Sequence, residues 1–233
     1  MRAPDIIKAF RGGLLALCAL CIFVAVPSDA AAVQSGFQAD VLYADSAREP
    51  RKGGTVMTSG EQARIDVRLE KAGEFSLIVD MQGRRMQVLS QKLKGYVETS
   101  IEGEPHSWRD LFRSVSSMLL PQTLGLVSLQ EKSSEDMGRE RIQGLDAVKS
   151  RHVFTLGFLG SYRDISVIVW EHPAVAPFPL KAEVLEDDRT RGASVWLGNV
   201  RPVPGPEDRF FLPEGFSRFT SVLDLILYAL ASF

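Results

Sequence analysis

The chain has 233 residues, with 27 Lys and Arg against 29 Asp and Glu, which gives a formal net charge of −2. A nucleic-acid-binding protein needs a clustered basic excess to neutralise phosphates, so this near-neutral balance argues against a nucleic-acid partner. Hydrophobic residues make up 45% of the chain, a fraction that is typical of a globular protein and too high for a disordered one.

Residues 1–32 have the three parts of a secretory signal peptide. Three basic residues come before an apolar run, Leu14 to Val26, and small residues follow at 30–32. The run is shorter than the roughly 20 apolar residues of a membrane-spanning helix, so we expect a cleaved signal. An uncleaved N-terminal anchor is the alternative. Both interpretations place the protein outside the cytoplasm.

Both cysteines, Cys18 and Cys21, lie within this predicted signal. A leucine precedes each of them, whereas a lipidation signal has a small residue there, so we expect a product without a lipid anchor. The chain from residue 33 onward then has no cysteine. It can form no disulfide, no thiolate metal site and no cysteine nucleophile.

Alternating apolar and polar residues predict an antiparallel sheet in the first half of the chain. The clearest alternation is in residues 63–70, where every second residue is apolar. Short glycine-containing turns separate this strand from its predicted neighbours. The other predicted strands are 36–43, 54–57, 75–81, 85–89 and a short one from 94 onward. Short strands joined by such turns are typical of an antiparallel meander.

A helix is predicted from Ser107 to Pro121. Ser107 can cap the helix, with Asp110 three residues later, and Pro121 ends it. The apolar residues at helical spacing are Trp108, Leu111, Phe112, Val115, Met118 and Leu119. Taken alone, this pattern indicates an ordinary helix packed on a sheet.

The second half of the chain returns to strands. They are predicted at 152–159, 164–170, 180–185 and 193–200. Residues 133–136 and 186–189 are polar and charged, which predicts exposed loops. The proline-rich stretch 200–206 is not expected to form a central strand, because proline lacks the N–H that a ladder needs.

Residues 220–233 are almost entirely apolar, with Asp224 as the single charge. Ser221 together with Asp224 is a helix-start signal, and the segment is too short to span a membrane. Three interpretations remain open for this segment: a core helix, a lid over a cavity, and a contact surface for a partner.

No motif in the sequence indicates catalysis or metal binding. His106, His152 and His172 lack the spacing of metal ligands, and we expect each to be a satisfied or solvated side chain. The chain has no G-x-S-x-G elbow and no Walker or dinucleotide-binding pattern. Its acidic pairs, 135–136 and 187–188, fall in polar stretches that are typical of solvated turns. We therefore predict a non-enzymatic protein without metal or cofactor.

The second half also carries an ordered set of motifs. The order begins with G-R-E-R-I-Q-G at 138–144, continues with P-L-K at 179–181, and closes with P-E-D-R-F-F-L-P-E-G-F at 206–216. This order resembles the periplasmic lipoprotein-carrier superfamily of LolA/LolB-like proteins, although the closing run has one position fewer between its Asp and its Phe. The resemblance covers nearly all of residues 36–219.

The resemblance implies an α+β fold: a curved, unclosed antiparallel β-sheet (half-barrel) with helices packed on the concave face. Residues 33–219 would form this domain, between the signal peptide 1–32 and the apolar helical segment 220–233. In that family an apolar cavity between sheet and helices holds acyl chains. The implied lining residues are Ile65, Val67, Leu69, Phe75, Leu77 and Val79 of the sheet and Trp108, Phe112 and Val115 of the helix. A filled core without a cavity is the alternative.

The functional arginine of that superfamily falls nearest to Arg64. Arg64 has the same parity as Asp66 and Arg68, which form the polar face of their predicted strand. We therefore expect Arg64 to point to solvent, unless a bulge reverses the register and turns it toward the cavity.

The function implied by the resemblance is non-enzymatic binding or carriage of lipid or lipoprotein acyl chains in the periplasm of a Gram-negative-type envelope. The alternative is a protein-interaction or envelope-sensing module on the same fold. That module would dock on an envelope or membrane protein through its C-terminal apolar helix. A hydrolase ranks third.

Overall fold

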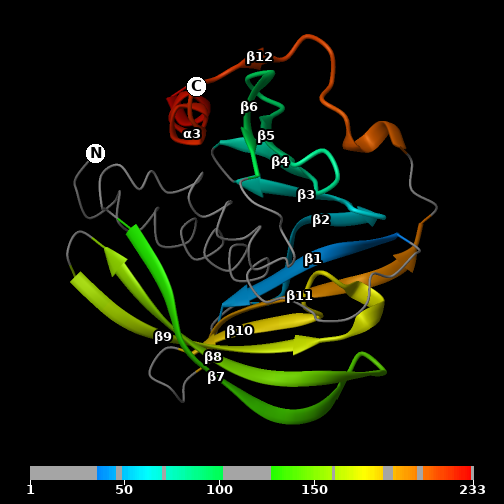
Figure 1. Ribbon diagram of the computed structural model, residues 1–233, viewed down its shortest axis with the longest axis vertical. Helices are drawn as coiled ribbons and strands as arrows, with labels where there is room; N and C mark the ends of the chain where they lie inside the picture. Colours follow the sequence, from blue (N-terminus) through cyan, green and yellow to red (C-terminus); the bar gives the residue numbers. More distant parts are fainter. Residues whose placement is uncertain are drawn as a thin grey trace.

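The computed structural model describes residues 36–45, 49–69, 72–101, 127–158, 161–185, 191–203 and 207–231. These residues form one large unclosed sheet of 12 strands and a single α-helix near the C-terminus (Figure 1). The class of the described part is therefore mainly β, where the sequence predicted α+β. The predicted signal peptide and the predicted helix 107–121 lie outside the described residues.

The first half of the sheet is a meander of consecutive antiparallel strands, as the alternating pattern predicted. The strands are β1 (Phe37–Asp45), β2 (Arg51–Ser59), β3 (Gln62–Leu69), β4 (Gly73–Asp80), β5 (Arg85–Ser90) and β6 (Gly95–Ser100). Gly60, in the β2–β3 turn, has a φ of 56°, a conformation that side chains rarely adopt. Glycine at this turn therefore allows the tight connection.

The second half of the chain adds five strands to the same sheet, and the last of them pairs with β1. The strands are β7 (Val127–Ile142), β8 (Leu145–Phe158), β9 (Ser161–Glu171), β10 (Lys181–Leu185) and β11 (Arg191–Pro202), with the short helix η2 (Pro173–Val175) after β9. β11 pairs antiparallel with β1, which gives the order β12-β6-β5-β4-β3-β2-β1-β11-β10-β9-β8-β7. One sheet thus contains both halves of the chain.

Residues 133–136, predicted as an exposed loop, belong to β7 instead. Among the described strands, β7 is the last one of the sheet and pairs only with β8, so these residues are exposed although they are extended. Charged residues and bulges protect an edge strand from pairing with other chains. β7 has both features, with register shifts between Glu131 and Ser133 and between Asp136 and Arg139.

The prediction that the proline-rich stretch 200–206 forms no central strand is wrong for its first three residues. β11 continues through Pro202, although it lies between β1 and β10 in the sheet. The pairing with β10 reaches only to Trp196. Within the described part of the chain, Pro202 therefore has a strand partner on one side alone, Phe37 at the start of β1. A proline at the end of a strand removes no ladder hydrogen bond from the sheet interior.

The C-terminal segment wraps around the β6 edge of the sheet. It contains the short helix η3 (Glu207–Phe210), the strand β12 (Ser217–Arg218) and the helix α3 (Val222–Ala231). η3 and α3 lie on opposite sides of strands β3–β6, and the sheet curves around the α3 side (Figure 1). We call the face under α3 the inner face and the face under η3 the outer face.

Each contact of this segment has a distinct physical basis. On the outer face, Phe210 packs against Met57, Ile78 and Leu89. At the edge, β12 pairs parallel with β6, and the Phe219 N–H donates to the Tyr96 carbonyl over 2.7 Å. On the inner face, the buried residues Val222, Leu225 and Ala229 pack against Phe75, Val88 and Val97.

Gly95 allows α3 to approach β6 closely. A Cβ at this position would lie 2.5 Å from a ring carbon of Phe219 and 2.9 Å from a methyl carbon of Leu225. Any larger residue would therefore push the helix off the sheet. No helix in the described part of the chain is both long and apolar enough to cross a membrane.

The main core joins the two halves of the sheet. Its buried members include Phe37, Val56, Ile65, Met86, Phe154, Val167, Val169, Phe178, Leu180 and Leu197. Phe37 at the start of β1 and Phe178 after η2 meet edge to face, with ring centroids 6.4 Å apart. This arrangement is favoured for aromatic pairs.

Trp170 on β9 is buried between two lysines. The Nζ atoms of Lys149 and Lys181 lie 5.1 Å and 4.7 Å from its ring centroid. The Trp170 Nε1–H donates to Glu140 Oε2 over 3.1 Å, and Lys149 Nζ contacts the same oxygen at 2.8 Å. The hydrogen bond from Lys149, followed by that from Trp170, lowers the pKa of Glu140 below its usual value.

We predict an acid-sensitive contribution to stability from Glu140. A lowered pKa means that the charged carboxylate stabilises the fold above its unfolded pKa of about 4.3, and that this contribution is lost as the pH falls through the folded pKa. Glu140→Gln should remove about 0.5 kcal/mol at pH 7, since the pair is solvent-screened, and much less at pH 3. Urea unfolding between pH 3 and 7 measures this. Glu214→Gln, in the loop before β12, is the control, and equal losses at both pH values would contradict the prediction.

We also predict that α3 is held by its buried side. Leu225 is 0% exposed and Leu223, on the same helix, is 43% exposed. Leu225→Ala should lower the free energy of unfolding by about 2–5 kcal/mol, because it removes buried methyl groups and leaves a cavity. Leu223→Ala has the same effect on helix propensity, but it should change the free energy of unfolding by about 0.5 kcal/mol or less. Urea denaturation compares the two, and equal effects would contradict this packing.

Candidate functional site

Five of the predicted lining residues share the inner face of the sheet. The register pairs Ile65 with Leu77 and Val67 with Phe75, and places Val79 on the same face opposite Ala63. The backbone of Leu69 pairs with Gly73, and its side chain lies outside the described residues. Trp108, Phe112 and Val115 also lie outside them. The sheet part of the predicted lining is thus brought together.

Val67 and Leu77 mark a seam on the inner face. Both contact the main core on one side and the cluster under α3 on the other. Both are only partly buried, whereas Ile65, Phe75 and Val79 around them are buried. The seam therefore leaves apolar surface accessible between two filled regions.

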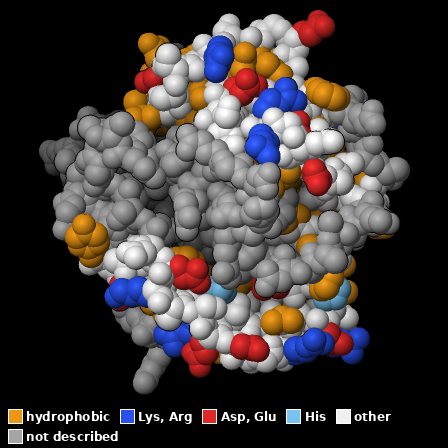
Figure 2. All heavy atoms as spheres, in the orientation of Figure 1, with side chains coloured by type: hydrophobic (Ala, Val, Ile, Leu, Met, Phe, Trp, Pro, Cys, Tyr) orange, Lys and Arg blue, Asp and Glu red, His pale blue; other side chains and the backbone are white. Residues whose placement is uncertain are grey.

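The helix α3 has one buried side and one exposed side. Ser221 caps it, since the Asp224 N–H donates to Ser221 Oγ over 3.0 Å, as the helix-start signal predicted. Away from the sheet, Leu223, Leu227 and Tyr228 are 43%, 51% and 62% exposed. Figure 2 shows hydrophobic side chains at this end of the molecule. The segment is thus a packed helix that also presents an apolar surface.

A buried histidine interrupts the apolar inner face at its other end. Cross-strand pairs Ser150–Val169, Val169–Ala182 and Ala182–Val195 place Ser150 on the inner face, and His152 follows two residues later on β8. His152 is 3% exposed and contacts Ser150 and Glu131. The sequence predicted a satisfied or solvated histidine, and could not show both partners because one of them comes from β7.

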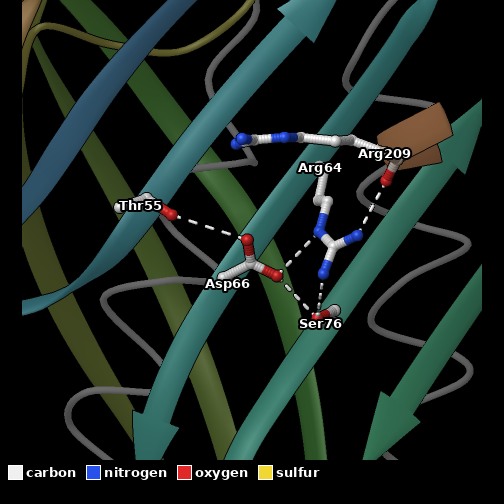
Figure 3. Close-up of polar contacts among 5 residues, drawn as sticks. All are labelled: Thr55, Arg64, Asp66, Ser76 and Arg209. Atoms are coloured by element: carbon white, nitrogen blue, oxygen red, sulfur yellow. Dashed lines mark hydrogen bonds and ion pairs between the residues drawn. The ribbon is translucent and has the colours of Figure 1, made fainter. Parts of the chain in front are cut away.

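Arg64 lies on the outer face, under the C-terminal segment (Figure 3). Its guanidinium donates to Asp66 Oδ1 at 2.8 Å, to Ser76 Oγ at 3.0 Å and to the Arg209 carbonyl in η3 at 2.7 Å. Ser76 Oγ donates in turn to Asp66 Oδ1 over 2.6 Å. Arg64 thus lies on the polar face of its strand and away from the inner face, as its parity predicted. It does not point freely to solvent, because η3 covers it and leaves its side chain 17% exposed. Contact of Arg64 with a ligand stays a prediction.

A shallow hollow of about 580 Å³ lies at the turn between β2 and β3. Its lining residues are Ser59, Gly60, Glu61, Gln62, Gln82 and Phe211. This mainly polar lining does not suit an alkyl chain. In the described ranges, no group of three or more His, Cys, Asp or Glu side chains is placed to hold a metal ion.

No protein-family model and no curated protein matches this sequence. Among solved structures, an uncharacterised conserved protein of Thermus thermophilus shares 11% identity over 80% of this chain and 91% of its own, with a TM-score of 0.47. The Mycobacterium tuberculosis lipoprotein LppX shares 12% identity over 87% of this chain and 98% of its own, with a TM-score of 0.33.

The Pseudomonas aeruginosa MucA/MucB complex is also similar. It shares 13% identity over 84% of this chain and 59% of the matched chain, with a TM-score of 0.32. These similarities in fold are distant. Their TM-scores are all below 0.5, so they assign no role to any residue of this chain.

We predict that Arg64 holds the C-terminal segment on the outer face. Arg64→Met removes the hydrogen bond to the Arg209 carbonyl and leaves Asp66 without its cation, which should cost about 1–3 kcal/mol. Limited proteolysis should then cut the segment 207–219 faster than in the unchanged protein. Arg68→Met, an exposed position on the same strand, is the control. Equal cleavage of the two variants would contradict the anchoring role.

Proposed function

We propose that this protein binds the acyl chains of a lipid or lipoprotein along the inner face of its sheet, by burial and without a covalent step. The observation that carries the proposal is the seam at Val67 and Leu77. This partly buried apolar surface lies between the main core and the α3 cluster, on a face that is apolar over most of the sheet.

The energetics of alkyl burial suit such a site. Removing alkyl chain from water stabilises by about 0.8 kcal/mol per CH₂, so a chain of about 14 CH₂ groups gains on the order of 11 kcal/mol before the cost of association. The main core and the packed helix α3 on either side would hold the walls of the seam in place. The aromatic helix predicted at 107–121, with Trp108, Phe112 and Val115, would complete the lining.

We propose the periplasm as the compartment of this binding, because residues 1–32 are predicted to be a signal peptide. A carrier there would shield acyl chains from water between membranes. The exposed polar side chains of the outer face and of the β7 edge suit an aqueous compartment. In this proposal residues 33–219 form the binding domain, and α3 closes one end of its inner face.

Native mass spectrometry of the protein purified from cells tests the proposal. We expect co-purifying lipid on the unchanged protein, and at least a tenfold lower lipid-bound fraction for Leu77→Gln, because a buried amide next to an alkyl chain loses its hydrogen bonds to water. Leu227→Gln makes the same chemical change on the exposed side of α3 and should retain the lipid. A folded, lipid-free protein that also takes up no added fatty acid would contradict acyl-chain binding.

The exposed side of α3 favours a second candidate, a protein-interaction or envelope-sensing module. Leu223, Leu227 and Tyr228 form an apolar surface at one end of the molecule. In this case Leu227→Gln should abolish pull-down of an envelope or membrane protein, and Leu77→Gln should not. The same two variants therefore separate the two candidate functions.

A further inference from the structure

A serine, a histidine and a glutamate form a hydrogen-bonded chain on the inner face. Ser150 Oγ lies 2.9 Å from His152 Nε2, and His152 Nδ1 lies 2.8 Å from Glu131 Oε1. A strand places residues two apart on one face, so Ser150 and His152 face the same side of β8. Glu131 reaches the histidine from β7 along a diagonal, because the direct register partner of His152 is Ser134.

The partners of the imidazole determine the direction of its hydrogen bonds. A carboxylate only accepts, so Nδ1 carries the proton that is donated to Glu131. In the neutral ring Nε2 is then an acceptor, and it faces the hydroxyl of Ser150. The same arrangement of hydroxyl, imidazole and carboxylate activates a serine for nucleophilic attack.

We call Ser150, His152 and Glu131 the relay. Its central residue is buried, and the residues at its two ends are partly exposed. His152 is 3% exposed, whereas Ser150 is partly buried and the Glu131 side chain is 34% exposed. The cross-strand neighbours of Ser150 and His152 on β9 are the buried residues Val169 and Val167. The serine hydroxyl therefore lies beside the apolar side chains of β9.

Two interruptions of β7 flank this group. The first register shift lies between Glu131 and Ser133, and the second lies between Asp136, the partner of Ser150, and Arg139. Bulges occur preferentially at sheet edges and next to active sites, where they change the direction of side chains. Here they bracket the stretch of β7 that faces Ser150 and His152.

We propose that Ser150 is an activated nucleophile that accepts the acyl group of an apolar carboxylic ester, with His152 as its base and Glu131 as the positioning residue. Ser150 Oγ attacks the ester carbonyl carbon while His152 Nε2 takes the hydroxyl proton. The bond to the alcohol breaks, and His152 returns this proton to the departing alkoxide. Water then attacks the acyl carbon while His152 Nε2 takes a proton from it. The bond to Ser150 Oγ breaks, His152 returns the proton to this oxygen, and a carboxylic acid is released.

This inference goes beyond the proposed lipid binding and does not depend on it. An ordinary structural role for the group, in which His152 links β7 to β8, predicts a loss of stability on mutation but no reactive hydroxyl. The reactivity of Ser150 toward an electrophile is therefore the measurement that separates the two roles. A phosphonylating probe suits this purpose, because it reports an activated serine without requiring turnover.

The test treats the purified full chain with an alkyl fluorophosphonate and locates the adduct by peptide mass spectrometry. We expect phosphonylation at Ser150, no adduct at this peptide for Ser150→Ala, and a labelling rate at least about 100-fold lower for His152→Gln and Glu131→Gln. Hydrolysis of p-nitrophenyl octanoate should fall in parallel. Ser134→Ala, at an exposed serine on the neighbouring strand, should label and hydrolyse like the unchanged protein.

Circular dichroism and thermal unfolding verify that each variant is folded. Because His152 is buried, its variant can fail to fold, and Glu131→Gln at a partly exposed position then supplies the same comparison. A folded protein that is not labelled at Ser150, or Glu131→Gln labelling at the unchanged rate, overturns the proposal. Lipid retention is measured on the same samples, and Ser150→Ala should keep the lipid that Leu77→Gln loses, so the two proposals fail separately.

Discussion

The pairing of β1 with β11 is the interaction on which the rest of the structure depends. It joins the meander β1–β6 to the strands β7–β11, and it brings together residues such as Val41 and Leu197 that lie far apart in the sequence. Without this ladder each half would present an unpaired edge and half of an apolar face. With it, the inner face runs from the α3 cluster through the seam at Val67 to the relay at Ser150.

The C-terminal segment covers the β6 edge of the sheet, at the end away from β7. Its elements occupy the outer face, the β6 edge and the inner face in turn, so a short stretch of chain covers three different surfaces. Arg64 holds the segment from beneath through the Arg209 carbonyl, and Gly95 leaves room for Leu225 and Phe219. The segment therefore sets where the apolar inner face ends, which is why it matters for any ligand bound there.

The inner face combines two kinds of chemistry. Val67 and Leu77 offer apolar surface between filled regions, and Ser150, His152 and Glu131 provide a hydrogen-bonded relay beside the apolar side chains of β9. Burial of an acyl chain requires only the first. A covalent step at an ester requires the second, because an unactivated serine hydroxyl is a weak nucleophile at neutral pH. The two proposals thus assign different residues of one face to two separate functions.

Local patterns in the sequence were enough to predict the meander and the start of α3. The alternation in residues 63–70 and the Ser221–Asp224 cap depend on neighbours within a few positions, and both are present in the structure. Three features needed the tertiary structure. Residues 133–136 are extended because β8 pairs with them at an edge that tolerates charge, Arg64 is covered because η3 returns over it, and His152 gains Glu131 from another strand. Each of these features depends on which segments become neighbours in the fold. Neighbours in a sheet are determined by pairing between residues distant in the chain, and the periodicity of a single strand does not encode this pairing.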